Sequence, residues 1–270
     1  MTSQQTPVTP MPGAEPIETL ADTGEGRRVG VLLAHGFTGT PQAMRGWATE
    51  LQRSGWSVSV PLLPGHGTTW RDMNTTGWRD WYGALEDALA RLNEHCEQVV
   101  IAGLSMGGTL AIRLTQQYGP DGPASLGDRL LGTMLINPSL STERRDAFLL
   151  PVAQRLIGSF PGISNDIAKP GVRELAYTRL PLRAAYSLQE LWGITSSDLG
   201  MVSTPLVLYQ SATDHIVEPA SARILLSGVA STDVSHHILP RSFHVATLDY
   251  DAQYIFDTSR RWISDRLGPT

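Results

Sequence analysis

The sequence of 270 residues contains a single cysteine, Cys96. A lone cysteine can form neither a disulfide within the chain nor a zinc site built on cysteine ligands. The chain also lacks any run approaching 18 consecutive apolar residues, so we expect no membrane-spanning helix. Residues 1–16 have no basic start and no apolar centre, which argues against a signal peptide. We expect a cytoplasmic protein with a flexible lead-in over residues 1–16.

Positive charge is scarce as well, since 21 Lys and Arg residues face 26 Asp and Glu residues. The net charge of −5 argues against nucleic acid as a partner, because phosphate binding requires a positive surface. The motifs GxxxxGK[ST], HExxH and GxGxxG are absent, so the sequence offers no support for a nucleotide or metal site. We therefore expect a protein that works without a metal or cofactor.

Apolar runs of strand length alternate with segments of helical spacing along most of the chain. The expected strands are residues 29–34, 56–60, 99–102, 132–137, 205–210 and 237–239. The expected helices are residues 41–53, 78–94, 105–118 and 250–267. With 41% hydrophobic residues the chain can bury a sizeable core. The alternation predicts an α/β fold with a mostly parallel central sheet flanked by helices.

One interval, residues 139–200, breaks this alternation. It contains four prolines and no convincing strand, and its apolar residues recur at helical spacing. An insertion that follows the carboxyl end of a strand is well placed to cover a site there. We therefore expect a small, mainly helical cap over residues 139–200, inserted into a core made of residues 17–138 and 201–270.

The pentapeptide GLSMG, residues 103–107, follows an expected strand directly and opens an expected helix. A serine on such a sharp turn has its hydroxyl exposed at the end of the sheet, and the glycines let neighbouring backbone pass close by. Since a serine hydroxyl is a weak nucleophile until a base removes its proton, Ser105 predicts a histidine, an acid and an oxyanion hole elsewhere.

An acid and a base follow Ser105 in the order serine, acid, histidine, which is one of the chain orders known for such a triad. Asp214 comes just after one expected strand, and His244 lies between the last strand and the last helix. We predict that Ser105 attacks an acyl carbonyl and that His244 takes its proton and delivers it to the leaving group. Asp214 would orient the imidazole and stabilise its charged form.

Other acids and histidines compete for these roles. Asp198 precedes the strand that Asp214 follows, and Asp233 lies too late, so both are weaker candidates for the acid. His35 and His66 flank loops near the predicted site, and we expect them to organise those loops. Four further histidines are expected to be structural or to lie on the surface: His95, His215, His236 and His237.

The carbonyl oxygen would gain negative charge during the attack and needs preorganised donors. The backbone N–H of Met106, the residue after the nucleophile, is one candidate. The second is expected in the loop after the first buried strand, where we favour the N–H of Phe37 over the hydroxyl of Thr38.

Four motifs together resemble the α/β-hydrolase superfamily: HGFTG at 35–39, PGHG at 64–67, GLSMGG at 103–108 and FHVATLD at 243–249. More narrowly, the chain is similar to the small bacterial carboxylesterases and monoacylglycerol lipases over residues 29–137 and 205–267. This resemblance implies hydrolysis of monoacylglycerols or short-to-medium acyl esters through an acyl-enzyme on Ser105, without a cofactor. It also implies that Phe37 and Met106 supply the oxyanion hole.

The same three residues would also serve thioester, peptide or C–C bond hydrolysis and acyl transfer, and a non-catalytic binding module is a further alternative. The expected partner is a small ester or lipid, with transient lipid contact and no stable membrane insertion. An acyl chain needs an apolar slot that leads to the serine. The residues expected to contact substrate are Phe37, Thr38, Phe148, Leu149, Ile157, Leu188, Leu191 and Val217.

Overall fold

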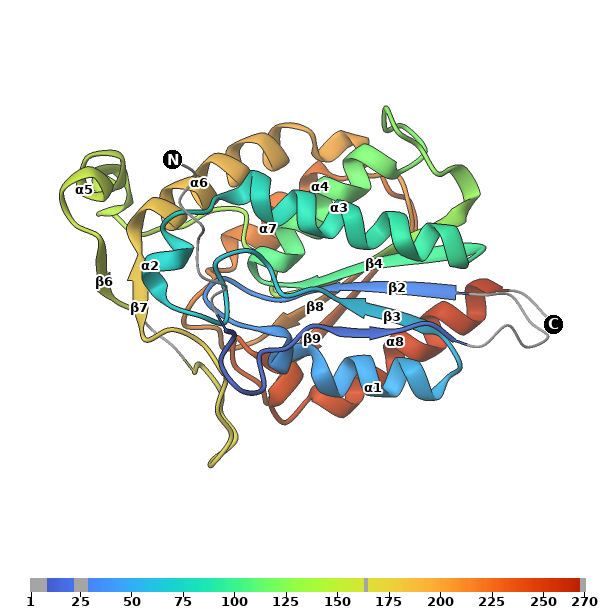
Figure 1. Cartoon of the computed structure of the whole chain (residues 1–270). Helices are drawn as coiled ribbons and strands as arrows, with labels where there is room; N and C mark the ends of the chain where they lie inside the picture. Colours follow the sequence, from blue (N-terminus) through green and yellow to red (C-terminus); the bar gives the residue numbers. More distant parts are fainter. Residues whose placement is uncertain (1–8, 22–28, 163–164, 268–270) are drawn as a thin grey trace, which may run out of the picture.

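The structure, a computed structural model, describes residues 9–21, 29–162 and 165–267. Its centre is a seven-stranded sheet in the order β1-β3-β2-β4-β5-β8-β9 (Figure 1). The strands of this sheet are β1 (Ile17–Thr19), β2 (Val29–Ala34), β3 (Ser57–Val60), β4 (Gln98–Leu104), β5 (Leu130–Ile136), β8 (Leu206–Ser211) and β9 (Val234–Leu239). Only the pairing of β1 with β3 is antiparallel; every other pair in this sheet is parallel.

Helices cover both faces of the sheet (Figure 1). One face carries α3 (Trp78–His95), α4 (Met106–Tyr118), α6 (Leu182–Ser197) and α7 (Ala220–Gly228). The opposite face carries α1 (Arg45–Arg53) and α8 (Ala252–Leu267). Shorter helices are α2 (Trp70–Met73), α5 (Leu150–Leu156), η1 (Pro41–Met44), η2 (Gly127–Arg129), η3 (Ala147–Leu149), η4 (Leu199–Met201) and η5 (Ala246–Leu248). This arrangement confirms the predicted α/β fold with a mostly parallel sheet.

The strand β2 shows why the central strands have no polar face. All six of its residues are buried, and they alternate between two cores. Leu32 packs into the core under α3 and α4, whereas Val31 and Leu33 pack into the core under α1 and α8. A parallel strand covered on both sides therefore has a continuous apolar sequence. Each fully buried side chain of this kind stabilises the fold by about 1.5–3 kcal/mol.

The segment 139–200 lies between β5 and β8 and contributes η3, α5 and α6. It also contains a second, two-stranded antiparallel sheet of β6 (Ser159–Pro161) and β7 (Arg179–Pro181). The expectation that this segment has no strand was therefore wrong. Each strand has only three residues and ends in proline, which is too short to show an alternating pattern.

Part of the expected N-terminal lead-in contacts the core. The backbone N–H of Met11 donates to the carbonyl oxygen of Gly67 at 2.6 Å, and Ala14 is fully buried. Residues 1–8 of this lead-in lie outside the described residues. The edge strand β1 that follows was not predicted, since its three residues are partly exposed or exposed.

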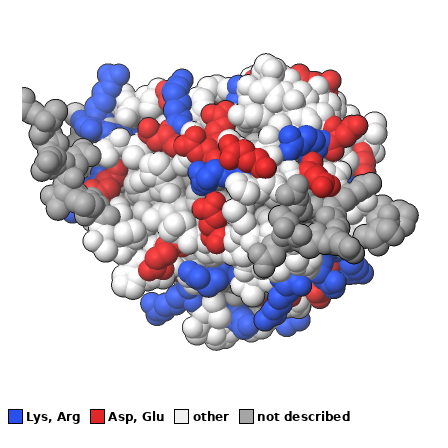
Figure 2. All heavy atoms as spheres, turned by 45° about the vertical axis from the view of Figure 1, so that its right-hand side comes forward, with Lys and Arg blue, Asp and Glu red and all other residues white. Residues whose placement is uncertain are grey.

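The surface carries both signs of charge. Acidic and basic side chains intermix on the face drawn in Figure 2. Within the described residues, no helix combines the length and apolar character that crossing a membrane requires.

Candidate active site

The turn between β4 and α4 holds Ser105 in a backbone conformation that side chains rarely adopt. Its φ is 57° and its ψ is −120°, and its backbone N–H donates to the carbonyl oxygen of Ile136 at 2.9 Å. A non-glycine residue in such a region costs about 1–3 kcal/mol, which the surrounding structure must supply. A side chain on Gly103 would collide with the carbonyl oxygen of Gly107, and one on Gly107 with that of Ala34. The two glycines of the motif are therefore required by close backbone packing.

His244 and Asp214 lie together at the same end of the sheet. The imidazole Nδ1 is 2.8 Å from Asp214 Oδ2, and each side chain is only 8% exposed. The other carboxylate oxygen, Oδ1, accepts from the backbone N–H groups of Ile216 and Val217, both at 2.8 Å. Each oxygen of this carboxylate thus has its own donors, which fixes its orientation.

The electrostatics of this pair favour a charged imidazole. Burial alone disfavours the charge, but the carboxylates of Asp214, Glu174 and Asp166 outweigh it and raise the pKa of His244 above its usual value. Burial likewise opposes ionisation of Asp214, yet the imidazole and the two backbone donors keep the pKa of this carboxyl below its usual value.

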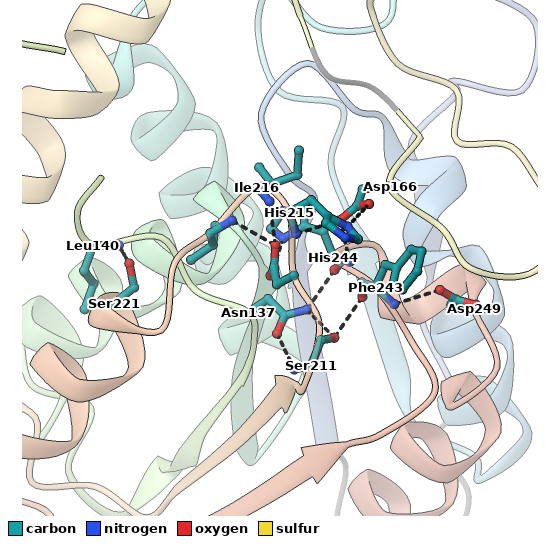
Figure 3. A network of polar contacts seen from close by, with 12 residues as sticks. Asn137, Leu140, Asp166, Ser211, His215, Ile216, Ser221, Phe243, His244 and Asp249 are labelled. Carbon is teal, nitrogen blue, oxygen red and sulfur yellow. Dashed lines mark hydrogen bonds and ion pairs between the residues drawn. The ribbon is translucent and has the colours of Figure 1, made fainter. Parts of the chain in front are cut away.

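Asn137, directly after β5, ties the loop of His244 to the neighbouring strand (Figure 3). Its side-chain Nδ2 donates to the carbonyl oxygen of His244 at 2.8 Å and to Ser211 Oγ at 2.9 Å. Ser211 Oγ donates in turn to the carbonyl oxygen of Phe243 at 2.8 Å. The sequence offered one unused signal for Asn137, namely a polar residue at the carboxyl end of a central strand.

The loop after β2 is braced by buried rings. His35 Nε2 accepts from the backbone N–H of Leu63 at 3.2 Å, and its Nδ1 lies 3.0 Å from the carbonyl oxygen of Gly36. Burial lowers the pKa of His35 to about 4, so this ring is neutral and Nδ1 is its donor. His66 packs edge-on against His35 with ring centres 5.0 Å apart. Both histidines therefore hold this loop in place.

The two expected oxyanion donors lie on this loop and on the turn between β4 and α4 that carries Ser105, which is called the elbow below. Phe37 packs edge-on against Trp81, with ring centres 5.9 Å apart, and Thr38 beside it has a φ of 62°. Met106 is the first residue of α4, a position where the backbone N–H has no acceptor within the helix.

Glu174 lies at the candidate site, and the sequence did not reveal it. Its carboxylate lies against the loop after β2, because a side chain on Gly39 would come within 2.7 Å of Glu174 Oε1. Burial raises the pKa of this carboxyl to about 7, and the charge of His244 acts in the opposite direction. Glu174 stands in a segment without helix or strand, so no periodic pattern marks it.

The competing acids and most competing histidines have other partners. Asp198 pairs with Arg113 at 2.7 Å, and Asp233 pairs with Arg266. Three of the histidines contact groups away from the His244–Asp214 pair: His95 contacts the carbonyl oxygen of Arg91, His236 contacts Gln210, and His237 contacts Tyr254. His215 is the exception, because it shares the carboxylate of Asp166 with the backbone of His244.

The residues predicted to contact substrate differ in how far their side chains are exposed to solvent. Phe148 is 77% exposed, and Leu149 and Ile157 are also exposed. Leu188 and Leu191 lie on α6 and are buried against the core. Val217, together with Asp214 and Ala222, lines a cavity of about 300 Å³ at the start of α7.

Among the residues that the structure describes, no group of three or more His, Cys, Asp or Glu side chains is arranged to hold a metal ion.

Comparison with known proteins identifies the family. Residues 26–251 match the family described as serine aminopeptidase, S33. The chain is 36% identical to the thermostable monoacylglycerol lipase of Bacillus sp. (strain H-257), over 98% of this chain and 100% of that protein. It is 27% identical to a carboxylesterase of Bacillus subtilis (strain 168), over 86% of this chain and 91% of that one. A solved structure from work on LipS and LipT, two metagenome-derived lipolytic enzymes, has a TM-score of 0.87 at 35% identity. It covers 95% of this chain and 100% of that one.

These matches confirm the resemblance noted in the sequence. The chain belongs to the serine aminopeptidase S33 family of the α/β-hydrolase superfamily and is an ester hydrolase.

Proposed function

We propose that this enzyme hydrolyses monoacylglycerols, with Ser105 as nucleophile, His244 as base and Asp214 as the acid that orients the base. The observation that carries the proposal is the buried His244–Asp214 pair, held at 2.8 Å at the sheet edge where β4 delivers the elbow serine. The nearly full-length similarity to a monoacylglycerol lipase supports the choice of substrate.

The proposed reaction has two balanced halves. Ser105 Oγ bonds to the acyl carbon while His244 Nε2 takes the hydroxyl proton, and the carbonyl electron pair becomes an oxyanion facing the N–H groups of Phe37 and Met106. Collapse expels the glycerol oxygen, which receives the proton from His244. Water then repeats the sequence, with His244 as base, and releases the fatty acid and free Ser105.

The position of Glu174 favours a substrate whose leaving group carries free hydroxyls. Its carboxylate lies beside the proposed oxyanion loop, where it can accept hydrogen bonds from the free hydroxyls of a glycerol head. A monoacylglycerol has two free hydroxyls, whereas a triacylglycerol has none. We therefore assign the polar end of the substrate to Glu174 and expect simple alkyl esters to lose this contact.

The segment 139–200 is proposed to act as a cap over the core of residues 17–138 and 201–270. Its outer surface exposes large apolar side chains, among them Phe148, Val152 and Leu156, which suit transient contact with lipid rather than stable insertion. A cytoplasmic location and the absence of a nucleic-acid partner remain part of this proposal.

The proposal is tested with purified protein on a chain-length series of 1-monoacylglycerols and on matched methyl, diacyl and triacyl esters. We expect the highest kcat/KM on monoacylglycerols and loss of hydrolysis in Ser105→Ala. Hydrolysis that survives Ser105→Ala rules out the mechanism, and a preference for triacylglycerols rules out the substrate.

The matched family is described as serine aminopeptidase, so hydrolysis of amide bonds is tested as well. Aminoacyl p-nitroanilides are assayed beside the esters under the same conditions. We expect no turnover above that of Ser105→Ala, and turnover of these amides at a rate comparable with the esters assigns the enzyme to peptides instead.

A further inference from the structure

Residues 165–177, which lie between β6 and β7, form neither helix nor strand and are called the connecting loop below. It leaves the β6–β7 pair and runs past the carboxyl end of the central sheet (Figure 1). At its far end, Tyr177 donates from its backbone N–H to the carbonyl oxygen of Thr38 at 3.2 Å and from its hydroxyl to that of Gly65 at 2.8 Å. The connecting loop is thus fixed to the loops around the proposed site.

Asp166 is the contact of this loop with the proposed base (Figure 3). Its Oδ2 accepts from the backbone N–H of His244 at 3.2 Å and from that of His215 at 3.1 Å. Its Oδ1 faces His215 Nδ1 at 2.8 Å, and its carbonyl oxygen accepts from the N–H of Val245 at 3.1 Å. The Asp166 side chain is 9% exposed. One buried carboxylate therefore binds His244 itself and the residue that follows Asp214.

A second carboxylate joins the same two loops, and it belongs to the chain segment that follows His244. Asp249, near the start of α8, accepts from the backbone N–H groups of Ala168 and Lys169 at 2.7 and 3.0 Å. It also accepts from the N–H of Phe243 at 2.9 Å. The connecting loop and the loop of His244 are therefore joined by reciprocal charged hydrogen bonds, which are stronger than neutral ones.

We propose that Asp166 is a positioning residue for His244, through which the connecting loop holds the imidazole in the orientation that proton transfer requires. This rests on the proposed role of His244 as the base. Asp166 touches neither substrate nor Ser105 in this scheme, because it acts through the backbone of His244 and through His215.

The electrostatic effect of Asp166 acts in the same direction. Three carboxylates affect His244: Asp214 from the loop between β8 and α7, and Glu174 and Asp166 from the connecting loop. Each raises the pKa of His244 against the effect of burial. Loss of the Asp166 charge should therefore lower the pKa of His244, a change that loss of packing alone does not predict.

The test is Asp166→Asn, which keeps the size of the side chain. An amide has one acceptor oxygen and one NH₂ group, so it cannot accept from His215 Nδ1 and from both backbone donors at once. We expect kcat to fall about ten- to hundredfold with KM nearly unchanged, since small misplacements of catalytic groups cost about this much. We also expect the midpoint of the pH–kcat/KM profile to move down by about half a unit or more.

Asp80→Asn is the matched control. Asp80 Oδ2 also accepts a backbone N–H, that of Gly77 at 2.8 Å, but at the start of α3. Its loss should lower thermal stability without moving the pH midpoint. If Asp166→Asn likewise changes only the melting temperature, with kcat and the midpoint unchanged, the positioning role is wrong.

Two variants of His215 decide the question if Asp166→Asn does not fold. His215→Leu removes the donor to Asp166, and His215→Asn supplies a neutral donor at the position of Nδ1. We expect kcat to fall severalfold in His215→Leu and to recover in His215→Asn. Equal activity of both variants and the original enzyme overturns the proposal.

The rate of covalent labelling of Ser105 by a fluorophosphonate, measured against pH, separates this inference from the proposed function. Labelling that is absent from the original enzyme, or that persists in Ser105→Ala, removes the proposed function. Labelling that needs Ser105 but has the same pH midpoint in Asp166→Asn removes only the role of Asp166.

Discussion

Replacing Asp214 by asparagine should hold His244 in the wrong tautomer, with its proton on Nε2 and not on Nδ1. In the structure Oδ1 of Asp214 accepts two backbone N–H groups at 2.8 Å, from Ile216 and Val217, while Oδ2 faces His244 Nδ1 at 2.8 Å. An asparagine in this position must keep its oxygen on the two backbone donors. Its NH₂ group then points at Nδ1, which has to accept rather than donate.

The consequence is an imidazole whose proton sits on Nε2, the nitrogen that should take the proton of Ser105. The equivalent change in a known serine protease lowers kcat by about 10⁴, and we expect a similar loss here. That loss corresponds to about 5.4 kcal/mol of transition-state stabilisation. Because both backbone donors stay satisfied, the stability at neutral pH should fall much less than the activity.

The assay is kcat on a p-nitrophenyl ester, with the melting temperature measured on the same preparation. Asp198→Asn is the control, since Asp198 is a partly exposed carboxylate that pairs with Arg113 at 2.7 Å and lies outside the proposed triad. It should keep most of the activity. A loss below about tenfold in Asp214→Asn, in a folded protein, would mean that another group orients His244.

Three further predictions concern the His244–Asp214 pair, the turn that carries Ser105 and the recognition of the glycerol head by Glu174. Because the pKa of His244 is raised, kcat/KM should increase with pH and reach half its maximum above pH 6.5; a flat profile between about pH 5 and 8 contradicts His244 as the base. Gly107→Ala should lower the melting temperature and kcat together, since the new methyl group meets the backbone of Ala34 and His35, at a cost of about 1–3 kcal/mol; calorimetry with unchanged stability would contradict this packing. Glu174→Gln should lower kcat/KM for monoacylglycerols severalfold and leave methyl esters nearly unaffected, and equal loss on both refutes its role in recognition.

Much of the core was predictable because burial imposes a simple pattern on it. Strands covered on both faces need a continuous apolar sequence, and β2 and β8 were found within one residue of their bounds on that basis. The edge strand β9 begins at Val234, three residues before its predicted start. Its residues alternate between exposed and half-buried, so only the buried end at Leu239 marks the strand.

The candidate triad was also predictable, for a topological reason. Parallel strands present their carboxyl ends at one edge of the sheet, so residues that directly follow β4, β8 and β9 must lie near one another whatever their distance in sequence. Chain order and strand ends together indicated Asp214 and His244, and the structure brings these two to 2.8 Å. Asn137 follows the same rule after β5 and could have been found in the same way.

The inserted segment was harder to read, because helical spacing does not say which neighbour a helix packs against. Phe148 and Leu188 both lie in the inserted segment and both recur at helical spacing, yet Phe148 is 77% exposed, whereas Leu188 is 7% exposed on the core-facing side of α6. A periodic pattern identifies an amphipathic face, and whether that face meets the core, a substrate or a lipid surface depends on the tertiary arrangement.

The connecting loop shows where sequence reasoning fails in principle. Asp166 and Glu174 reach the proposed site from a stretch without periodicity, where each acidic residue resembles an ordinary solvated loop residue. Their role depends on contacts with residues about 80 and 135 positions away, at His244 and Gly39. Such contacts leave no local pattern, since the Asp166 carboxylate binds backbone N–H groups and Glu174 lies against a glycine, and neither contact requires a particular side chain of its partner. Asp166 and Glu174 therefore had to come from the structure, whereas the candidate triad could be predicted from strand order.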